Sequence, residues 1–205
     1  PLEMVDDIIT VSKCGTTAVA LNQTVNTFIE LKKLKLSEGK CSQIHVGKIA
    51  NKCATHKVGE EIMKRSGKEK YLGDFVSEKG NSKETIEDRK IRGNAVVAQM
   101  TALLQDIPIG NRKVKAGIAL RRAWFINGCL FNPEVWMKYS PQDLHDLEII
   151  DNQILRIITG AQQKAPTEML FLETAELPMK HVITVRRLLY LRTILRRHKQ
   201  EITYI

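Results

Sequence analysis

The spacing of hydrophobic positions along the chain changes near residue 80. In the N-terminal part, short apolar runs alternate with turn residues, which is typical of brief strands. Such runs predict strands at residues 4–11, where they flank Asp6 and Asp7, at 41–46 and at 69–76, with a weaker strand signal at Lys57-Val58. Between them, apolar residues over 16–36 recur at helical spacing, and Gly39 is expected to end that helix.

From residue 80 onward, the apolar spacing is helical throughout. Helices are predicted at residues 82–105, 112–131, 141–159, 166–174 and 178–199. Ser82 is a candidate N-cap, Pro141 stands at a first helical position, and Gly160 is a candidate C-cap. The pattern therefore predicts an α+β chain, with a small mixed unit over 1–80 and a bundle of about five helices over 81–205.

The charge balance of the chain favours a polyanionic partner. It has 32 Lys and Arg residues against 23 Asp and Glu residues, a formal net charge of +9. Nucleic acid is the commonest polyanion, and an anionic membrane surface is the alternative. No apolar run approaches the roughly 18 residues that span a bilayer, and the start of the chain does not look like a signal peptide. We therefore expect a protein that is neither membrane-spanning nor secreted.

The cysteine content and the first residue set two further expectations. With 4 cysteines in 205 residues the chain is no disulfide scaffold, so a reducing compartment is expected. Because the first residue is Pro rather than Met, the chain is expected to begin inside a longer protein or to be a processed product.

Adjacent carboxylates at Asp6 and Asp7 stand in a turn between two short apolar runs. Like charges repel in such a position unless they share a cation, and hard divalent ions such as Mg²⁺ prefer oxygen ligands. In two-metal phosphoryl transfer, such acids hold the ions that activate the attacking hydroxyl and stabilise the leaving oxygen. A solvated turn is the alternative, because Asp is also a common turn residue.

Several motifs follow the Asp-Asp pair in a defined order. They are MVDDI at 4–8, the helix at 16–36, LKLSEGKC at 34–41, KYLGDFVSEKG at 70–80, IEDR at 86–89, NPEVW at 132–136 and LEIIDNQILRIITG at 147–160. In this order they resemble the reverse transcriptases of non-LTR, LINE-type retrotransposons. The resemblance covers essentially the whole chain. It implies the C-terminal part of a polymerase palm, with β-hairpins and a helix over 1–80, followed by an α-helical thumb bundle over 81–205.

This resemblance also implies a chemistry, which is RNA-directed DNA synthesis by two-metal phosphoryl transfer. Asp6, Asp7 and Lys40 would be catalytic. The two aspartates would bind Mg²⁺ or Mn²⁺, with two ions in the complete enzyme, and Lys40 would lie near the triphosphate. The primer grip, a hairpin that presses on the 3′ end of the primer, would consist of Tyr71, Leu72 and Gly73. Considered without the resemblance, Leu72 is expected to be ordinary strand core.

The partners implied by the resemblance are an RNA template, a DNA primer, their RNA–DNA hybrid and, in the complete enzyme, deoxynucleoside triphosphates. The expected location is the nucleus and cytoplasm, with no membrane. The chain departs from the family at Met4, where Phe or Tyr is common, and lacks the upstream palm motif with the other metal-binding aspartate. We therefore expect the chain alone to be inactive. The alternative is a decayed or truncated, non-catalytic module that binds nucleic acid.

The segment 178–200 is strongly basic and contains no acid. Its apolar residues form a broad face, so the simplest interpretation is a helix that packs its apolar side into the bundle and shows charge to water. The excess of positive charge favours phosphate contacts instead. The candidates for these contacts are Arg186, Arg187, Arg192, Arg196 and Arg197. A membrane-surface helix is a further alternative.

A zinc site is a weaker hypothesis. Its ligands would be Cys41, His45, Cys53 and His56, but the spacing C-x3-H-x7-C-x2-H is not that of a usual zinc finger. The default interpretation is buried thiols and loop histidines.

Overall fold

The computed structural model describes residues 8–34, 40–47, 56–59, 61–136 and 138–202. The chain divides into two compact units, Pro1–Asn81 and Ser82–Ile205, and this boundary lies one residue from the one expected from the sequence. The first unit contains short strands and one helix, and the second contains helices only among its described residues. The fold is therefore of mixed helix and strand content, as the hydrophobic pattern predicted.

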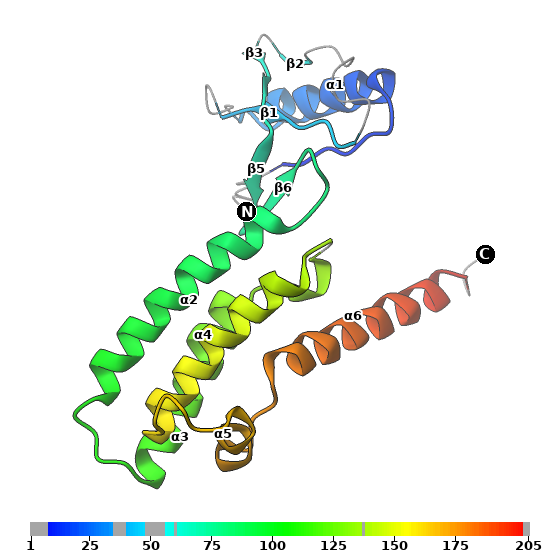
Figure 1. Ribbon diagram of the computed structural model, residues 1–205. Coiled ribbons are helices and arrows are strands. Elements are labelled where there is room, and N and C mark those ends of the chain that lie inside the picture. Colours follow the sequence, from blue (N-terminus) through cyan, green and yellow to red (C-terminus); the bar gives the residue numbers. More distant parts are fainter. Residues whose placement is uncertain (1–7, 35–39, 48–55, 60, 137, 203–205) are drawn as a thin grey trace. The chain divides into compact units, whose positions relative to one another are not determined.

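In its described part, the first unit holds one helix and three separate two-stranded sheets (Figure 1). Its elements are α1 (Gly15–Leu31), β1 (Ser42–Gln43), β2 (Lys57–Val58), β3 (Glu61–Ile62), β4 (Lys64–Arg65), β5 (Lys68–Tyr71) and β6 (Asp74–Ser77). Strand β1 pairs with β4 in parallel, whereas β2 pairs with β3 and β5 with β6 in antiparallel hairpins. Helix α1 contacts β2.

Two strand predictions in this unit are wrong in extent. Residues 8–11 are not a strand, and Ile8, Ile9 and Val11 are 46%, 47% and 82% exposed. Of the strand expected at 41–46, only Ser42 and Gln43 pair, because β4 offers just two residues in register. An apolar run becomes a strand only where a neighbouring strand satisfies its backbone groups, and short runs do not reveal their neighbours.

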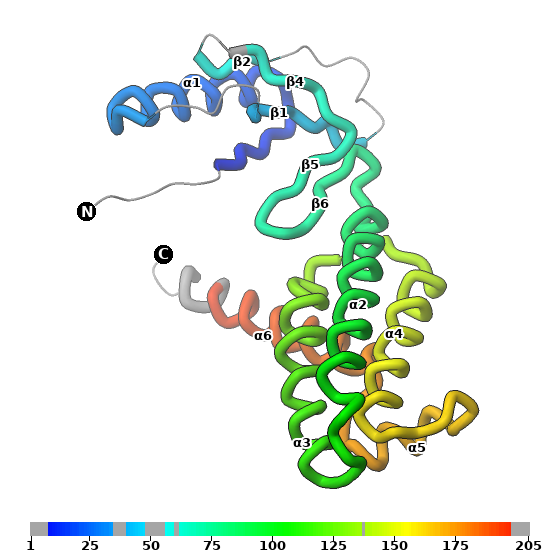
Figure 2. Tube along the Cα trace, turned by 90° about the vertical axis from the view of Figure 1, so that its left-hand side faces the viewer, coloured from blue at the N-terminus to red at the C-terminus, as the bar shows by residue number. Residues whose placement is uncertain are grey.

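Five α-helices form most of the second unit. Its elements are α2 (Lys83–Leu104), α3 (Asn111–Leu120), the π-helix η2 (Arg121–Cys129), the 3-10 helix η3 (Pro133–Val135), α4 (Pro141–Thr159), α5 (Thr167–Thr174) and α6 (Met179–Ile202). Helices α2, α3 and α4 lie alongside one another (Figure 2). The core is centred on α4 and contains Met100, Phe125, Leu147, Ile154, Leu155 and Ile158, all at 0% exposure. The predicted bundle of about five helices is confirmed.

Local sequence signals set the ends of α4. The Ser140 hydroxyl accepts a hydrogen bond from the backbone N–H of Asp143, whose carboxylate in turn accepts from the Ser140 N–H, and Pro141 opens the helix. Gly160 ends it at a φ of 71°, a left-handed conformation that glycine adopts without steric cost. Ser82 does precede α2, but its side chain makes no cap hydrogen bond, since its ψ of 19° is far from the extended backbone that N-caps need.

The helix predicted at 112–131 is not one continuous α-helix. Helix α3 ends at Leu120, and the chain continues as a π-helix in which the Leu130 N–H donates to the Phe125 carbonyl at 2.8 Å. Arg121 and Phe125, four residues apart in this π-helix, are both fully buried. Helix α3 also approaches α4 closely, because a Cβ on Gly117 would lie 2.6 Å from the Ile158 side chain.

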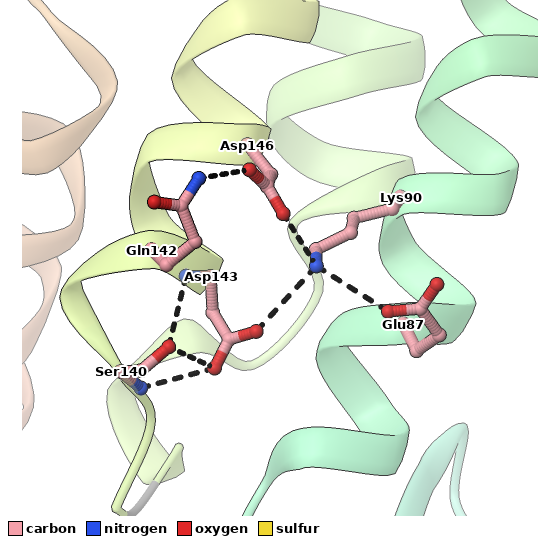
Figure 3. A network of polar contacts seen from close by, with 6 residues as sticks. All are labelled: Glu87, Lys90, Ser140, Gln142, Asp143 and Asp146. Atoms are coloured by element: carbon pink, nitrogen blue, oxygen red, sulfur yellow. Dashed lines mark hydrogen bonds and ion pairs between the residues drawn. The ribbon is translucent and has the colours of Figure 1, made fainter.

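A polar clamp joins the N-terminal parts of α2 and α4 (Figure 3). The Lys90 ammonium lies 2.8 Å from Asp146, 3.3 Å from Glu87 and 3.5 Å from Asp143. The hydrogen bond to Asp146 is the main cause that raises the Lys90 pKa to about 12. Asp143 also belongs to the cap of α4, so one carboxylate fixes both the start of that helix and its contact with α2.

A buried ion-pair network fixes the segment that leads into α6. The Arg121 guanidinium, at 0% exposure, donates to both carboxylate oxygens of Asp151 at 2.7 Å and to Glu176 at 2.5 Å. Burial lowers the Arg121 pKa, but the hydrogen bonds and charges of Asp151 and Glu176 outweigh it, so the pKa is raised. Arg122, 63% exposed, also pairs with Glu176. Glu176 therefore anchors the chain just before α6 begins at Met179.

Candidate nucleic-acid interface

The hairpin β5–β6 places the predicted grip residues at its tip. Its register pairs Tyr71 with Asp74, which leaves Leu72 and Gly73 as a two-residue turn. Both have a positive φ, 47° for Leu72 and 91° for Gly73, as the type I′ turn of tight hairpins requires. Gly73 adopts this conformation freely, whereas Leu72 does so at a steric cost.

Leu72 is not strand core, so that expectation was wrong. Its side chain is 62% exposed at the hairpin tip, while Tyr71 is half-buried at the end of β5. The reason is the register, because a two-residue turn between Tyr71 and Asp74 excludes Leu72 from either strand. An exposed leucine in a turn position that favours Asn, Asp or Gly is a local conflict between sequence and structure.

One face of the same hairpin combines two ammonium groups with an aromatic ring. The Lys70 ammonium lies 5.4 Å from the centroid of the Phe75 ring, and the Lys68 ammonium lies 5.5 Å from it. Sequence reasoning passed over this face. The sequence did contain a signal for this face. Lys68 and Lys70 stand two residues apart on one predicted strand, and a two-residue turn pairs Lys70 with Phe75.

The remaining polymerase-type site residues are only partly described. Lys40 is exposed and stands two residues before β1. Asp6 and Asp7 lie outside the described residues, so the structure does not relate them to Lys40 or to the hairpin.

The zinc hypothesis receives no support from the described residues. The His45 and His56 rings lie edge to face with centroids 6.5 Å apart. Cys41 is half-buried, and Cys53 lies outside the described residues. Within the part of the chain that is described, no group of three or more His, Cys, Asp or Glu side chains is placed to hold a metal ion.

The first two arginines of the basic segment bond to the protein itself. Arg186 donates to the Leu130 carbonyl at 3.1 Å and to the Asn127 side chain at 2.7 Å. Arg187 donates to the carbonyls of Pro133 and Trp136 at 3.3 and 2.8 Å. The Arg187 guanidinium also lies 5.0 Å from the centroid of the Tyr139 ring. These two side chains fasten α6 onto η2, η3 and the turn after η3.

The other three candidate arginines, Arg192, Arg196 and Arg197, are exposed. They lie in residues 188–197, which we call the second half of α6. That half extends beyond the other helices of its unit (Figure 1). Its apolar residues are exposed too, with Leu188, Leu191, Ile194 and Leu195 at 61%, 51%, 43% and 55%. The expectation that the whole apolar side of this helix packs into the bundle was therefore wrong. Only Met179 and Ile183 of α6 are buried among its described side chains.

Comparison of the chain with protein-family models, with curated proteins and with solved structures found no match. Among the described residues, none of the helices combines the length and the apolar character needed to cross a bilayer.

Proposed function

We propose that the chain is the C-terminal palm and thumb part of a non-LTR-type reverse transcriptase and that it grips a primer–template duplex. The observation that carries the proposal is the β5–β6 hairpin, which exposes Leu72 at the tip of a tight turn. The motif order of the sequence and the basic end of α6 support it.

The backbone of Leu72 is strained, because its φ of 47° lies in the left-handed region. A left-handed conformation costs a non-glycine residue about 1–2 kcal/mol, and exposure of a large apolar side chain recovers none of it. Strained residues of this kind are concentrated at functional sites, where the surrounding structure holds them in place. An apolar side chain at a rigid, exposed tip suits contact with a sugar or base at the primer terminus.

The exposed arginines of α6 suit contact with a duplex backbone. Arg192, Arg196 and Arg197 are spaced over little more than one helical turn, and the segment 178–200 holds no acid to neutralise them. A primer–template hybrid approaches A-form, which proteins recognise mainly by its shape, phosphates and 2′-hydroxyls. Such contacts depend little on sequence and weaken steeply with salt.

The chemistry belongs to the complete enzyme. There, Asp6 and Asp7 would hold two Mg²⁺ or Mn²⁺ ions for deoxynucleoside triphosphate addition, and Lys40 would neutralise the leaving pyrophosphate. In a full-length parent protein, Asp6→Ala should abolish primer extension but leave template binding largely intact, because the residue is a metal ligand rather than a phosphate contact. A parent that binds hybrid but never extends a primer would favour the non-catalytic binding module.

The grip itself can be tested on this chain with Leu72→Asn. Asn suits the first position of a type I′ turn, so the thermal midpoint should stay equal or rise. Affinity for an RNA–DNA hybrid with a recessed primer 3′ end should nevertheless fall, because the apolar contact is lost. Leu31→Asn is the matched control, since Leu31 is 77% exposed at the end of α1. Equal affinity of the parent and Leu72→Asn would remove Leu72 from the grip.

A further inference from the structure

The outward face of α5 combines two exposed apolar side chains with two exposed acids. Met169 and Leu172 are 58% and 75% exposed and stand three residues apart, so they are neighbours on the helix surface. Glu168 precedes Leu172 by four residues and Glu173 follows Met169 by four, so each acid adjoins this pair. We call these four residues the α5 patch. It is apolar at its centre and acidic on both sides.

The second half of α6 combines apolar and basic side chains in a similar way. Leu188, Leu191 and Leu195 recur at intervals of three and four residues, so they form one stripe along the helix, and they are 61%, 51% and 55% exposed. Arg192 and Arg196 follow Leu188 at intervals of four residues, so they form a basic row beside the stripe. We call these five residues the α6 patch. It is apolar like the α5 patch and carries the opposite charge.

Within the described residues, no other part of the chain covers either patch, because all of the side chains in both patches are exposed. The charged side chains of the two patches also form no ion pair there. The second half of α6 extends beyond the other helices of its unit, so it does not lie against α5 (Figure 1). A partner for either patch therefore comes from outside the described part of one chain.

A second copy of the chain supplies the complement of each patch. Its α5 patch offers two carboxylates to the two arginines of the first copy, and the apolar centres of the two patches can pack together. Under two-fold symmetry the same contact forms twice, once in each direction. Pairing of α6 with α6 is disfavoured by comparison, because the segment 178–200 contains no acid to oppose its arginines. Charge complementarity therefore favours α5 of a second copy over α6.

We infer that two copies of the chain form a dimer in which the α5 patch of each copy packs against the α6 patch of the other. The inference goes beyond the proposed function and does not depend on it. Each patch is small, so the dimer is weak and the monomer predominates in dilute solution. The arginines of the α6 patch are also proposed phosphate contacts, so a bound RNA–DNA hybrid competes with the second copy.

The test is sedimentation equilibrium of the whole chain at increasing protein concentration. The average mass of the parent should rise from that of one chain toward that of two. The α6 variant, Arg192→Glu/Arg196→Glu, should raise the dissociation constant of the dimer by about tenfold or more, because like charges then face each other. The α5 variant, Glu168→Lys/Glu173→Lys, should do the same for the same reason.

An equimolar mixture of the α6 and α5 variants gives the sharpest result. The acidic α6 of the first variant then meets the basic α5 of the second, and the unchanged α5 of the first meets the unchanged α6 of the second. Both contacts of the two-fold dimer are again between opposite charges. The mixture should therefore return close to the dissociation constant of the parent, although neither variant dimerises well alone.

Further variants separate the contact from general electrostatics and from misfolding. Arg112→Glu/Lys115→Glu makes the same change of charge at two exposed positions of α3 and should not weaken the dimer. Leu172→Gln removes part of the apolar centre without changing charge and should weaken it. Leu103→Gln is the matched control, because Leu103 is 53% exposed on α2, and it should leave the dimer unchanged. Circular dichroism checks folding, and Leu172→Gln keeps the test decisive if a charge variant does not fold.

A parent chain that stays monomeric up to its solubility limit would overturn the inference and leave the proposed function untouched. A dimer weakened by the α6 variant but not by the α5 variant would also overturn it, since a different partner surface would then meet α6. So would a mixture of folded variants that fails to dimerise. Conversely, a dimer that passes these tests but that hybrid does not dissociate would support the inference and remove α6 from the nucleic-acid surface.

Discussion

Residues 179–187 and 188–197 of α6 have similar composition and opposite surroundings. The first half buries Met179 and Ile183, and its two arginines donate to carbonyls and an amide of the preceding helices. The second half, by contrast, exposes every residue from 188 to 197. Arginine and branched apolar residues thus hold the helix against the bundle in its first half, whereas the same residue types are exposed to solvent in its second half.

The two parts of α6 differ because only the first lies beside backbone carbonyls that can accept hydrogen bonds from its arginines. The carbonyls that Arg186 and Arg187 use belong to Leu130, Pro133 and Trp136, in the segment that spans the end of η2 and η3. Beyond them α6 leaves the bundle (Figure 1). Positive charge on this helix therefore has a structural role near its start and is exposed to solvent over residues 188–197.

The largest expected effect concerns the network that anchors the entry to α6. Arg121→Met should destabilise the chain by about 3–5 kcal/mol, because it leaves the buried Asp151 carboxylate without its partner and removes one of the two arginines that pair with Glu176. Arg122→Met, which removes an exposed partner of the same Glu176, should cost about 0–1 kcal/mol. Urea unfolding measures both. Equal effects would mean that burial does not distinguish the two arginines.

Two isoleucines of α6 provide a direct test of the two halves. Ile183 is 2% exposed and Ile194 is 43% exposed, so the same substitution samples both surroundings. Ile183→Ala should cost about 2–5 kcal/mol through lost burial and the cavity left behind. Ile194→Ala should cost less than about 1 kcal/mol, since much of its side chain already meets water. A comparable loss at Ile194 would show that the second half packs against protein.

A smaller contrast is expected between two arginines. Arg187→Gln should cost about 1–3 kcal/mol, because the carbonyls of Pro133 and Trp136 lose their charged donor. Arg197→Gln should change the free energy of unfolding by no more than about 0.5 kcal/mol, as is usual for exposed positions. Thermal unfolding of the two variants checks this, and a destabilised Arg197→Gln would contradict the division of α6.

Sequence signals predicted the fold where the causes are local. The start of α4 follows from Ser140 and Pro141, and its end follows from Gly160, all of which act within a turn of the chain. No local signal marks the π-helix at Arg121–Cys129, and the buried pair that its first residue makes with Asp151 joins positions 30 residues apart. Helix positions were therefore predictable, but the change of helix type was not.

The candidate site was less predictable than the fold. The roles of Arg186 and Arg187 depend on carbonyls more than 50 residues distant, which no local pattern indicates. The position of Leu72 depends on a pairing register that an apolar run leaves open, and a shift by one residue would place it in a strand. The basic character of α6 was visible in the sequence, but not which of its charges stay available.

The most direct test of the account is the salt dependence of RNA–DNA hybrid binding when the second half of α6 loses its charge. Replacing Arg192, Arg196 and Arg197 by Gln keeps good helix formers, so the thermal midpoint should not change. Three lost phosphate contacts should reduce the slope of log affinity against log salt by about 2.7. The control Arg186→Gln should instead lower the midpoint and leave the slope unchanged. A folded triple variant that keeps the parent slope would contradict the assignment of α6 as a nucleic-acid surface.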